Sequence, residues 1–166
     1  MRSRTDSLNT IRPIIHEDRE PLRRILEETD VFSGDEIWVA LELIDAVLND
    51  KNQKDYIIYT GVAEHGEVVG YFCIGPTPAT AGTYDLYWIA VKPSYHGKGA
   101  GKELLLFAEN LLKTWGGRIL VAETSSQPKY EKTRMFYRKA DFIEAARIKD
   151  YYRVGDDLVV YVKYLS

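Results

Sequence analysis

The 166-residue sequence contains a single cysteine, Cys73, and lacks any long uninterrupted hydrophobic run. One cysteine cannot build a disulfide framework, which favours a reducing, cytoplasmic location. Because Cys73 lies inside the apolar segment 68–74, we expect it to be a buried packing residue and not a nucleophile. A membrane-spanning helix requires ~20 consecutive apolar residues, so we expect no membrane partner.

An excess of positive charge is also lacking, since 22 lysines and arginines face 25 aspartates and glutamates, for a formal net charge of −3. This balance argues against a nucleic-acid partner and favours a small or cationic one. The length and the 45% hydrophobic composition are typical of one globular domain. We expect that domain over residues 10–166. A flexible polar tail at residues 1–9, without the apolar stretch of a signal peptide, precedes it.

Hydrophobic periodicity predicts an α/β domain. Branched and aromatic runs predict strands at 11–15, 56–63, 67–74, 84–91, 118–123, 142–152 and 158–165. Apolar residues at helical spacing predict helices at 17–28, 33–48, 132–139 and through 104–115. Ser33 and Glu36 have the spacing of a capping box, and Gly66 is expected to take a positive φ in a hairpin. Residues 75–82 are expected to form a loop, either a plain connection or a lip of the substrate site.

The most informative stretch is 83–115. An aromatic and branched run is closed by Pro93, three alternate glycines follow (Gly97, Gly99 and Gly101), and apolar residues then recur at helical spacing. This order predicts a strand, a tight turn and a helix. Glycines leave backbone N–H groups uncovered and the start of a helix adds partial positive charge, so the expected guest is a phosphate or diphosphate.

Two common phosphate-binding motifs do not fit this stretch. A P-loop requires Ser or Thr after Gly-Lys, whereas Glu103 follows Gly101 and Lys102. A dinucleotide-binding fingerprint requires glycine at the positions held by Lys102 and Leu104.

The segment 96–101, His-Gly-Lys-Gly-Ala-Gly, resembles the acyl-CoA signature of the GCN5-related N-acetyltransferase (GNAT) family, Gln/Arg-x-x-Gly-x-Gly/Ala. His96 stands where the family usually has Gln or Arg, and could contact a phosphate or remain an exposed bystander. The segment 136–142 resembles a second family motif in the correct order. The resemblance implies a single-domain fold with a central, mixed, mostly antiparallel twisted sheet, a splayed parallel strand pair, and helices on both faces.

The same resemblance implies acetyl-CoA as a co-substrate and no metal. Backbone N–H groups of the glycine turn would bind the diphosphate, with added charge from two lysines, and the end of the preceding strand would pair with the pantetheine amides. The residues implied in this binding are Ile89, Ala90, Val91, Gly97, Lys98, Gly99, Ala100, Gly101 and Lys102.

Two residues are the candidates for proton transfer. Tyr137 holds the family's tyrosine position, which implies that it protonates the departing CoA thiolate; an ordinary phenol, with a pKa of ~10, still carries the proton at neutral pH. Asp85 holds the family's position for a general base. Tyr87 projects from the same strand face as Asp85, and Glu123, which ends the neighbouring predicted strand, is a second candidate base. Tyr87 and Glu123 are also expected to bind the substrate amine.

Acids and aromatics gather at the predicted acceptor end, which suits an ammonium on a carbon chain. They are Asp85, Tyr87, Glu123, Asp150, Tyr151, Tyr152, Asp156 and Asp157, of which Asp156 and Asp157 could instead be hairpin-turn residues. No Cys or Ser constellation accompanies the glycine turn, which favours direct transfer without a covalent enzyme intermediate.

We therefore predict transfer of acetyl from acetyl-CoA to a primary amine of a small molecule. Two alternatives remain open, a protein N-terminal or lysine acetyltransferase acting on a peptide amine and a non-catalytic acyl-CoA-binding sensor. The resemblance also makes a homodimer possible.

Overall fold

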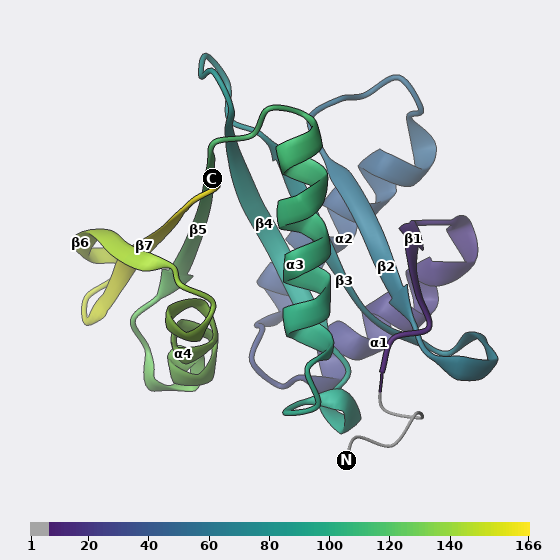
Figure 1. Ribbon diagram of the computed structural model, residues 1–166. Helices are drawn as coiled ribbons and strands as arrows, with labels where there is room; N and C mark the ends of the chain where they lie inside the picture. Colours follow the sequence, from purple (N-terminus) through teal and green to yellow (C-terminus); the bar gives the residue numbers. More distant parts are fainter. Residues whose placement is uncertain (1–6) are drawn as a thin grey trace.

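A seven-stranded sheet runs through the computed structural model, which describes residues 7–166 (Figure 1). The strands lie in the order β1-β2-β3-β4-β5-β7-β6, and each pair is antiparallel except β4 with β5. Their bounds are β1 Thr10–Pro13, β2 Ile57–Val62, β3 Val68–Pro76, β4 Thr83–Val91, β5 Ile119–Ser125, β6 Ile143–Arg153 and β7 Asp156–Tyr164.

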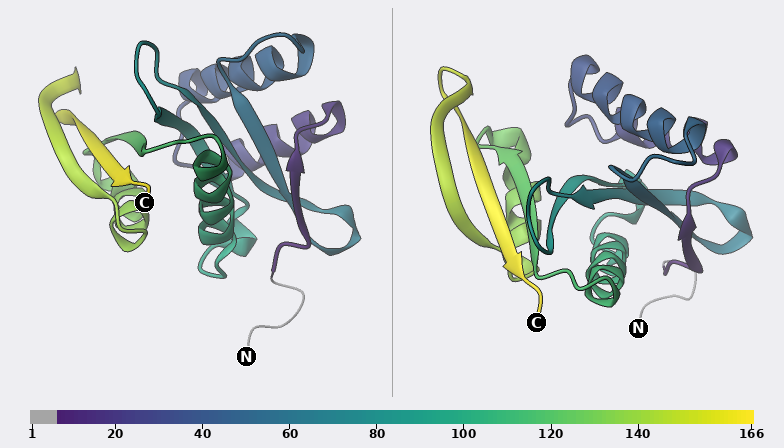
Figure 2. Two further views of the ribbon diagram at one scale, coloured as in Figure 1. Left: turned by 45° about the horizontal axis from the view of Figure 1, so that its top comes forward. Right: turned by 90° about the horizontal axis from the view of Figure 1, so that it is seen from above.

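Helices cover both faces of this sheet (Figure 2). On one face lie α1 (Arg19–Glu28) and α2 (Gly34–Asn49), and on the other lies α3 (Ala100–Thr114). The short helix α4 (Glu131–Lys139) contributes Tyr137 to the same hydrophobic cluster as α3. Within residues 7–166 no helix is both long enough and apolar enough to cross a membrane.

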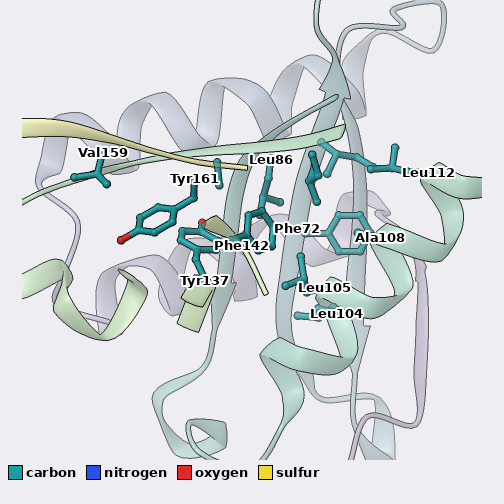
Figure 3. Packing of buried hydrophobic residues seen from close by; sticks show 13 residues of the cluster. Phe72, Leu86, Leu104, Leu105, Ala108, Leu112, Tyr137, Phe142, Val159 and Tyr161 are labelled. Atoms are coloured by element: carbon teal, nitrogen blue, oxygen red, sulfur yellow. The ribbon is translucent and has the colours of Figure 1, made fainter. Parts of the chain in front are cut away.

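Alternation along β3 explains why there are two hydrophobic clusters. Phe72 and Ile74 face α3, while Tyr71 and Cys73 face α1 and α2, as expected for side chains that alternate across a strand. Figure 3 shows the cluster on the α3 side, where Phe72 and Leu86 meet the leucines of α3. Cys73 is fully buried, and burial raises the pKa of its thiol to about 12, which confirms its predicted packing role.

Most predicted elements are confirmed, with ends shifted by one to three residues. Ser33 caps α2 by accepting a hydrogen bond of 3.2 Å from the Glu36 N–H, and Gly66 has a φ of 80°. One difference is that β3 continues into the predicted loop, so that Gly75 pairs with Asp85. Glycine is required there because a Cβ atom would lie 2.0 Å from the backbone oxygen of Asp55.

The remaining loop, residues 77–82, connects β3 to the start of β4, at the end of that strand opposite the glycine turn. It contacts the segment after α3, since Arg118 Nε donates to the backbone oxygen of Ala81 over 2.8 Å. None of its residues lines the two cavities described below, and the loop connects β3 to β4.

The predicted flexible tail, residues 1–9, is described only from residue 7 onward. Leu8 donates its N–H to Glu103 of α3, and the Asn9 N–H donates to Val62 of β2 over 2.8 Å. Leu8 also packs against the α3-side cluster. The end of the predicted tail is thus anchored to the domain, while residues 1–6 lie outside the described part of the chain.

The feature that positions the functional site is the point where β4 and β5 diverge, which is called the branch. These strands pair only from Thr83–Ile119 to Leu86–Ala122. Beyond that point β4 continues beside β3 and β5 continues beside β7, so the two strands diverge, and the predicted splayed parallel pair is confirmed. The β3–β4 register shifts by one residue at Tyr87, and such a bulge increases the local twist of a strand.

A substitution at Leu104 tests how much the packing of α3 on the sheet contributes to stability. Its side chain is fully buried, and its methyl carbons lie 3.1 Å from the positions that a Cβ would take at Gly61 and Gly70. Leu104→Ala is expected to lower the free energy of unfolding by roughly 3 to 5 kcal/mol, because it leaves a cavity that the sheet cannot fill. Urea denaturation measures this.

The matched control is Leu106→Ala on the same helix, where the side chain is 54% exposed. Its expected effect is within about 0.5 kcal/mol. Equal losses in the two variants would contradict the packing described here.

Candidate active site

Two connected cavities open where β4 and β5 diverge. The first, of about 820 Å³, lies between the end of β4, the glycine turn and α4, and is called the glycine-side cavity. The second, of about 650 Å³, lies between β4, β5, the start of α2 and the β6–β7 hairpin, and is called the acidic cavity. The residues that line both are Phe32, Ile89, Lys129 and Thr133.

The glycine turn presents unpaired backbone donors to its cavity. Gly97 and Gly99 take left-handed φ angles of 73° and 89°, a conformation that favours glycine. The N–H groups of Gly97, Gly99, Ala100 and Gly101 have no acceptor within residues 7–166. These residues line the glycine-side cavity at the start of α3, where the helix dipole adds partial positive charge, so the turn can bind an anion such as a diphosphate.

Lysines surround this cavity, although not all of the expected ones. Lys102 lines it, together with Lys129 and Lys132, which had not been singled out in the sequence. Lys98 does not line it, and its ammonium lies over the Tyr95 ring, 5.8 Å from the centroid. The turn therefore keeps a positive rim without a contribution from Lys98.

His96 is tied to the end of β4. Its Nε2 lies 2.7 Å from the backbone oxygen of Val91, to which a protonated Nε2 would donate. This hydrogen bond joins the glycine turn to the strand. Ile89, Ala90 and Val91 all line the glycine-side cavity, and on the β5 side of these residues no strand pairs with β4. That open strand edge could pair with the amides of an extended ligand.

Tyr137 lies at the base of the branch, on α4. It is 5% exposed and packs among the rings of Phe142 and Tyr161, with centroid distances of 5.2 and 5.6 Å (Figure 3). The centroid of the Phe136 ring lies 5.7 Å from that of Tyr137. It lines the acidic cavity, and its hydroxyl makes no hydrogen bond to any other described residue. Burial raises the pKa of Tyr137 well above the usual value of ~10, so the phenol holds its proton firmly.

The other three predicted side chains, Asp85, Tyr87 and Glu123, do not all lie on the same side of the branch. Asp85 lies in the section where β4 and β5 still pair; it accepts a 2.8 Å hydrogen bond from the Thr77 hydroxyl and lines neither cavity. Tyr87 and Glu123 lie just beyond the branch and both line the acidic cavity. Burial, with the nearby Asp85 carboxylate, raises the pKa of Tyr87 to about 12.

Of the remaining predicted acids and aromatics, only Tyr152 and Asp156 line the acidic cavity. Asp156 is 3% exposed and accepts a hydrogen bond from the Ser125 hydroxyl. Asp150 and Asp157 instead stabilise the β6–β7 hairpin, where Asp157 accepts the N–H of Asp150 over 2.9 Å. Asp157 therefore serves the hairpin, whereas Asp156, which pairs with Arg153 beside the turn, also lines the cavity.

The structure adds acids from α2 that the sequence did not mark as site residues. Asp35 and Glu36, in the first turn of this helix, line the acidic cavity, and Glu36 accepts a hydrogen bond from the Tyr130 hydroxyl. The only sequence signal was the capping box, which placed Glu36 at a helix start but not beside Tyr130, 94 residues away.

Arg134, which also carried no sequence signal, binds the segment that follows β5. It is 7% exposed, and its Nη1 donates to the backbone oxygens of Ser125 and Gln127 over 2.6 and 2.9 Å, while Nη2 pairs with Glu131 over 2.7 Å. A buried guanidinium that satisfies two carbonyls fixes the segment between β5 and α4.

Several known proteins are similar to this chain in sequence or in structure. A solved protein from Desulfovibrio desulfuricans, assigned to the GNAT family, is 40% identical, with a TM-score of 0.88 over 95% of this chain and 99% of its own. The N-alpha-acetyltransferase RimI of Mycobacterium tuberculosis is 29% identical over 131 residues, 77% of this chain and 75% of its own.

An aminoglycoside 6'-N-acetyltransferase complexed with coenzyme A shares the fold at 14% identity, with a TM-score of 0.72 over 95% of this chain and 97% of its own. Residues 17–142 match the family described as acetyltransferase (GNAT). The chain therefore belongs to the GNAT family of acetyltransferases and is an acyltransferase.

Proposed function

We propose that this protein transfers acetyl from acetyl-CoA to a primary amine of a small molecule. The observation that carries the proposal is the junction of two cavities of opposite character at Ile89. The glycine-side cavity offers unpaired N–H donors and lysines, which suit the diphosphate of a nucleotide thioester. The acidic cavity is large enough for a small amine, and its carboxylates attract cations.

In this proposal the diphosphate of acetyl-CoA binds the N–H groups of the glycine turn, from Gly97 to Lys102. The pantetheine arm pairs with the open edge of β4 at residues 89–91, and the thioester then lies at the junction of the cavities. Relatives of this fold solved with coenzyme A support the choice of cofactor. Lys102 adds positive charge from the cavity wall.

The reaction then needs no covalent enzyme intermediate. A neutral amine attacks the thioester carbonyl, and the negative charge that develops on the oxygen is stabilised by strand N–H groups of β4. When the tetrahedral species collapses, the carbon–sulfur bond breaks and the thiolate takes a proton from Tyr137. The proton lost by the amine passes to a base in the acidic cavity.

We assign the role of base to Glu123, although the sequence favoured Asp85. Glu123 lines the acidic cavity just past the branch, whereas Asp85 lies where β4 and β5 still pair and already accepts the Thr77 hydroxyl. Tyr87, two residues beyond Asp85 on β4, lines the same cavity and is proposed to contact the amine with its ring and hydroxyl.

Tyr137→Phe tests the acid. Removing the hydroxyl is expected to lower kcat by about 10²- to 10⁴-fold while the Kd for CoA stays within about twofold, because the ring that fills the core remains. Single-turnover kinetics and calorimetric titration with CoA measure the two effects.

Tyr161→Phe is the matched control, because this hydroxyl bonds to Arg138 over 3.2 Å and lines neither cavity. Equal kcat values for Tyr137→Phe and the unchanged protein would remove Tyr137 from the mechanism.

The pH dependence of kcat offers a second test of the acid. Because burial raises the pKa of Tyr137 above ~10, the protonated form persists beyond the range in which an exposed tyrosine would ionise. No loss of kcat from ionisation of this acid is therefore expected between pH 7 and about 10. An alkaline decline with a midpoint below that value, absent from Tyr137→Phe, would overturn the assignment.

Glu123→Gln and Asp85→Asn distinguish the two candidate bases. The first is expected to lower kcat/KM by about 10²-fold or more at neutral pH, and the second by no more than a few-fold. Steady-state kinetics with the best amine of a panel measures both. A larger loss in Asp85→Asn than in Glu123→Gln would return the role of base to Asp85.

The panel should include short amines and peptides with a free N-terminus, because the relative from M. tuberculosis is named as an N-alpha-acetyltransferase. Acetylation of peptides but of no small amine would favour the protein-directed alternative. Tight binding of acetyl-CoA with no thiol released by any amine would favour a non-catalytic sensor.

A further inference from the structure

The acidic cavity contains more negative than positive side chains. Four carboxylates line it, from α2, β5 and β7, against two cationic groups; the acids are Asp35, Glu36, Glu123 and Asp156, and the cations are Lys129 and Arg153. Within residues 7–166, Arg153 forms an ion pair only with Asp156, with 4.0 Å between Nε and Oδ2, and its side chain is 74% exposed. Lys129 lies over the Tyr130 ring, 5.3 Å from its centroid. Neither cation forms an ion pair with Asp35, Glu36 or Glu123 within residues 7–166.

Glu36 is held in place by uncharged partners. It accepts hydrogen bonds from the Tyr130 hydroxyl and, over 3.3 Å, from the Ser33 hydroxyl, while the capping bond between Ser33 and the Glu36 N–H fixes the first turn of α2. Tyr130 is 7% exposed, and burial, followed by the bond to Glu36, raises its pKa, so the phenol remains the donor. The result is a positioned, half-buried carboxylate whose charge no described cation balances.

Aromatic side chains stand around these carboxylates. Tyr152 lines the same cavity, and burial, followed by the charge of Glu123, raises its pKa to about 12. The Glu36 carboxylate also raises the pKa of Tyr152, so carboxylates from two different elements, β5 and α2, act on this phenol. A carboxylate beside phenol rings is a favourable environment for an alkylammonium group.

An independent observation shows that the cavity is built to receive a ligand. Tyr137, which is 5% exposed, lines the same cavity with a hydroxyl that has no hydrogen-bond partner among the described residues. An unpartnered phenol in an otherwise buried setting marks the reacting end of the cavity. It comes from α4, whereas Glu36 comes from α2, which packs in the other hydrophobic cluster.

From these features, and resting on the function proposed above, we propose that the acceptor is a dibasic amine, with two amino groups separated by a short carbon chain. One amine, in its neutral form, faces the thioester near Tyr137 and Glu123. The second remains an ammonium, bound by the Glu36 carboxylate beside the ring of Tyr152. The cavity volume of about 650 Å³ accommodates such a chain.

The test compares 1,4-diaminobutane with n-butylamine, which has the same chain but no second ammonium. The kcat/KM for the diamine is expected to be about tenfold to a hundredfold higher. At a given pH, a larger fraction of the diamine than of the monoamine carries a neutral amino group, which by itself favours the diamine. The decisive quantity is therefore the change in the diamine-to-monoamine ratio of kcat/KM between the unchanged protein and a variant.

Glu36→Gln keeps the size and the hydrogen-bond acceptor of the side chain but removes its charge. It is expected to lower the diamine-to-monoamine ratio at least about tenfold, mainly through the KM for the diamine. Glu42→Gln is the matched control, because it removes the same charge from an exposed position of α2 that does not line the cavity, and it should leave the ratio unchanged.

Three results would overturn the inference. An unchanged ratio in Glu36→Gln, or equal losses in both variants, would show that Glu36 does not bind the second ammonium, while acetylation of the two amines would leave the proposed function standing. Acetylation of an alanine tripeptide but of neither amine would replace the small-molecule acceptor by a peptide. Acetylation of no amine or peptide, with CoA still bound, would overturn the proposed function itself, and the inference with it.

Discussion

The divergence of β4 from β5 is the constraint on which the site depends. Inside a continuous sheet every backbone N–H and C=O is satisfied by a neighbouring strand. Here pairing stops after Leu86 and Ala122, and β4 continues to Val91 with no strand on that side. Polar groups on a strand edge in the middle of a sheet must be satisfied by side chains, water or a ligand. The branch therefore creates both the space for an extended ligand and the polar groups that bind it.

Packing on both sides keeps the branch open. Gly61 and Gly70 leave room for Leu104, which brings the first turn of α3, and with it the glycine turn, close to the end of β4. The bond between His96 and Val91 fixes the same junction from the side of the turn. On the other strand, Arg134 fastens the segment after β5 to α4. These polar and packing contacts differ between the two walls, while β4, β5, α3 and α4 share one hydrophobic cluster.

These contacts explain which parts of the site could be predicted. The glycine turn and Tyr137 could be predicted because each belongs to a short local motif, and the positive φ of Gly66 follows from its residue type. Asp85 was placed by counting along the chain, but such a count does not show where the strands separate. The pairing of Glu36 with Tyr130 joins residues 94 positions apart and leaves no local signal. Long-range packing, not propensity, decided these points.

The two cavities also differ in the polar groups that they leave unpaired. The glycine-side cavity exposes N–H donors and lysines, whereas the acidic cavity exposes carboxylate oxygens around phenols. A diphosphate is repelled by the second and an ammonium by the first, so under the proposed function each reactant has one favourable place. Both cavities include Ile89 in their lining, so the proposed sites of the two reactants adjoin there. In this proposal, charge separation along a single strand edge supplies the positioning that direct transfer between two bound substrates requires.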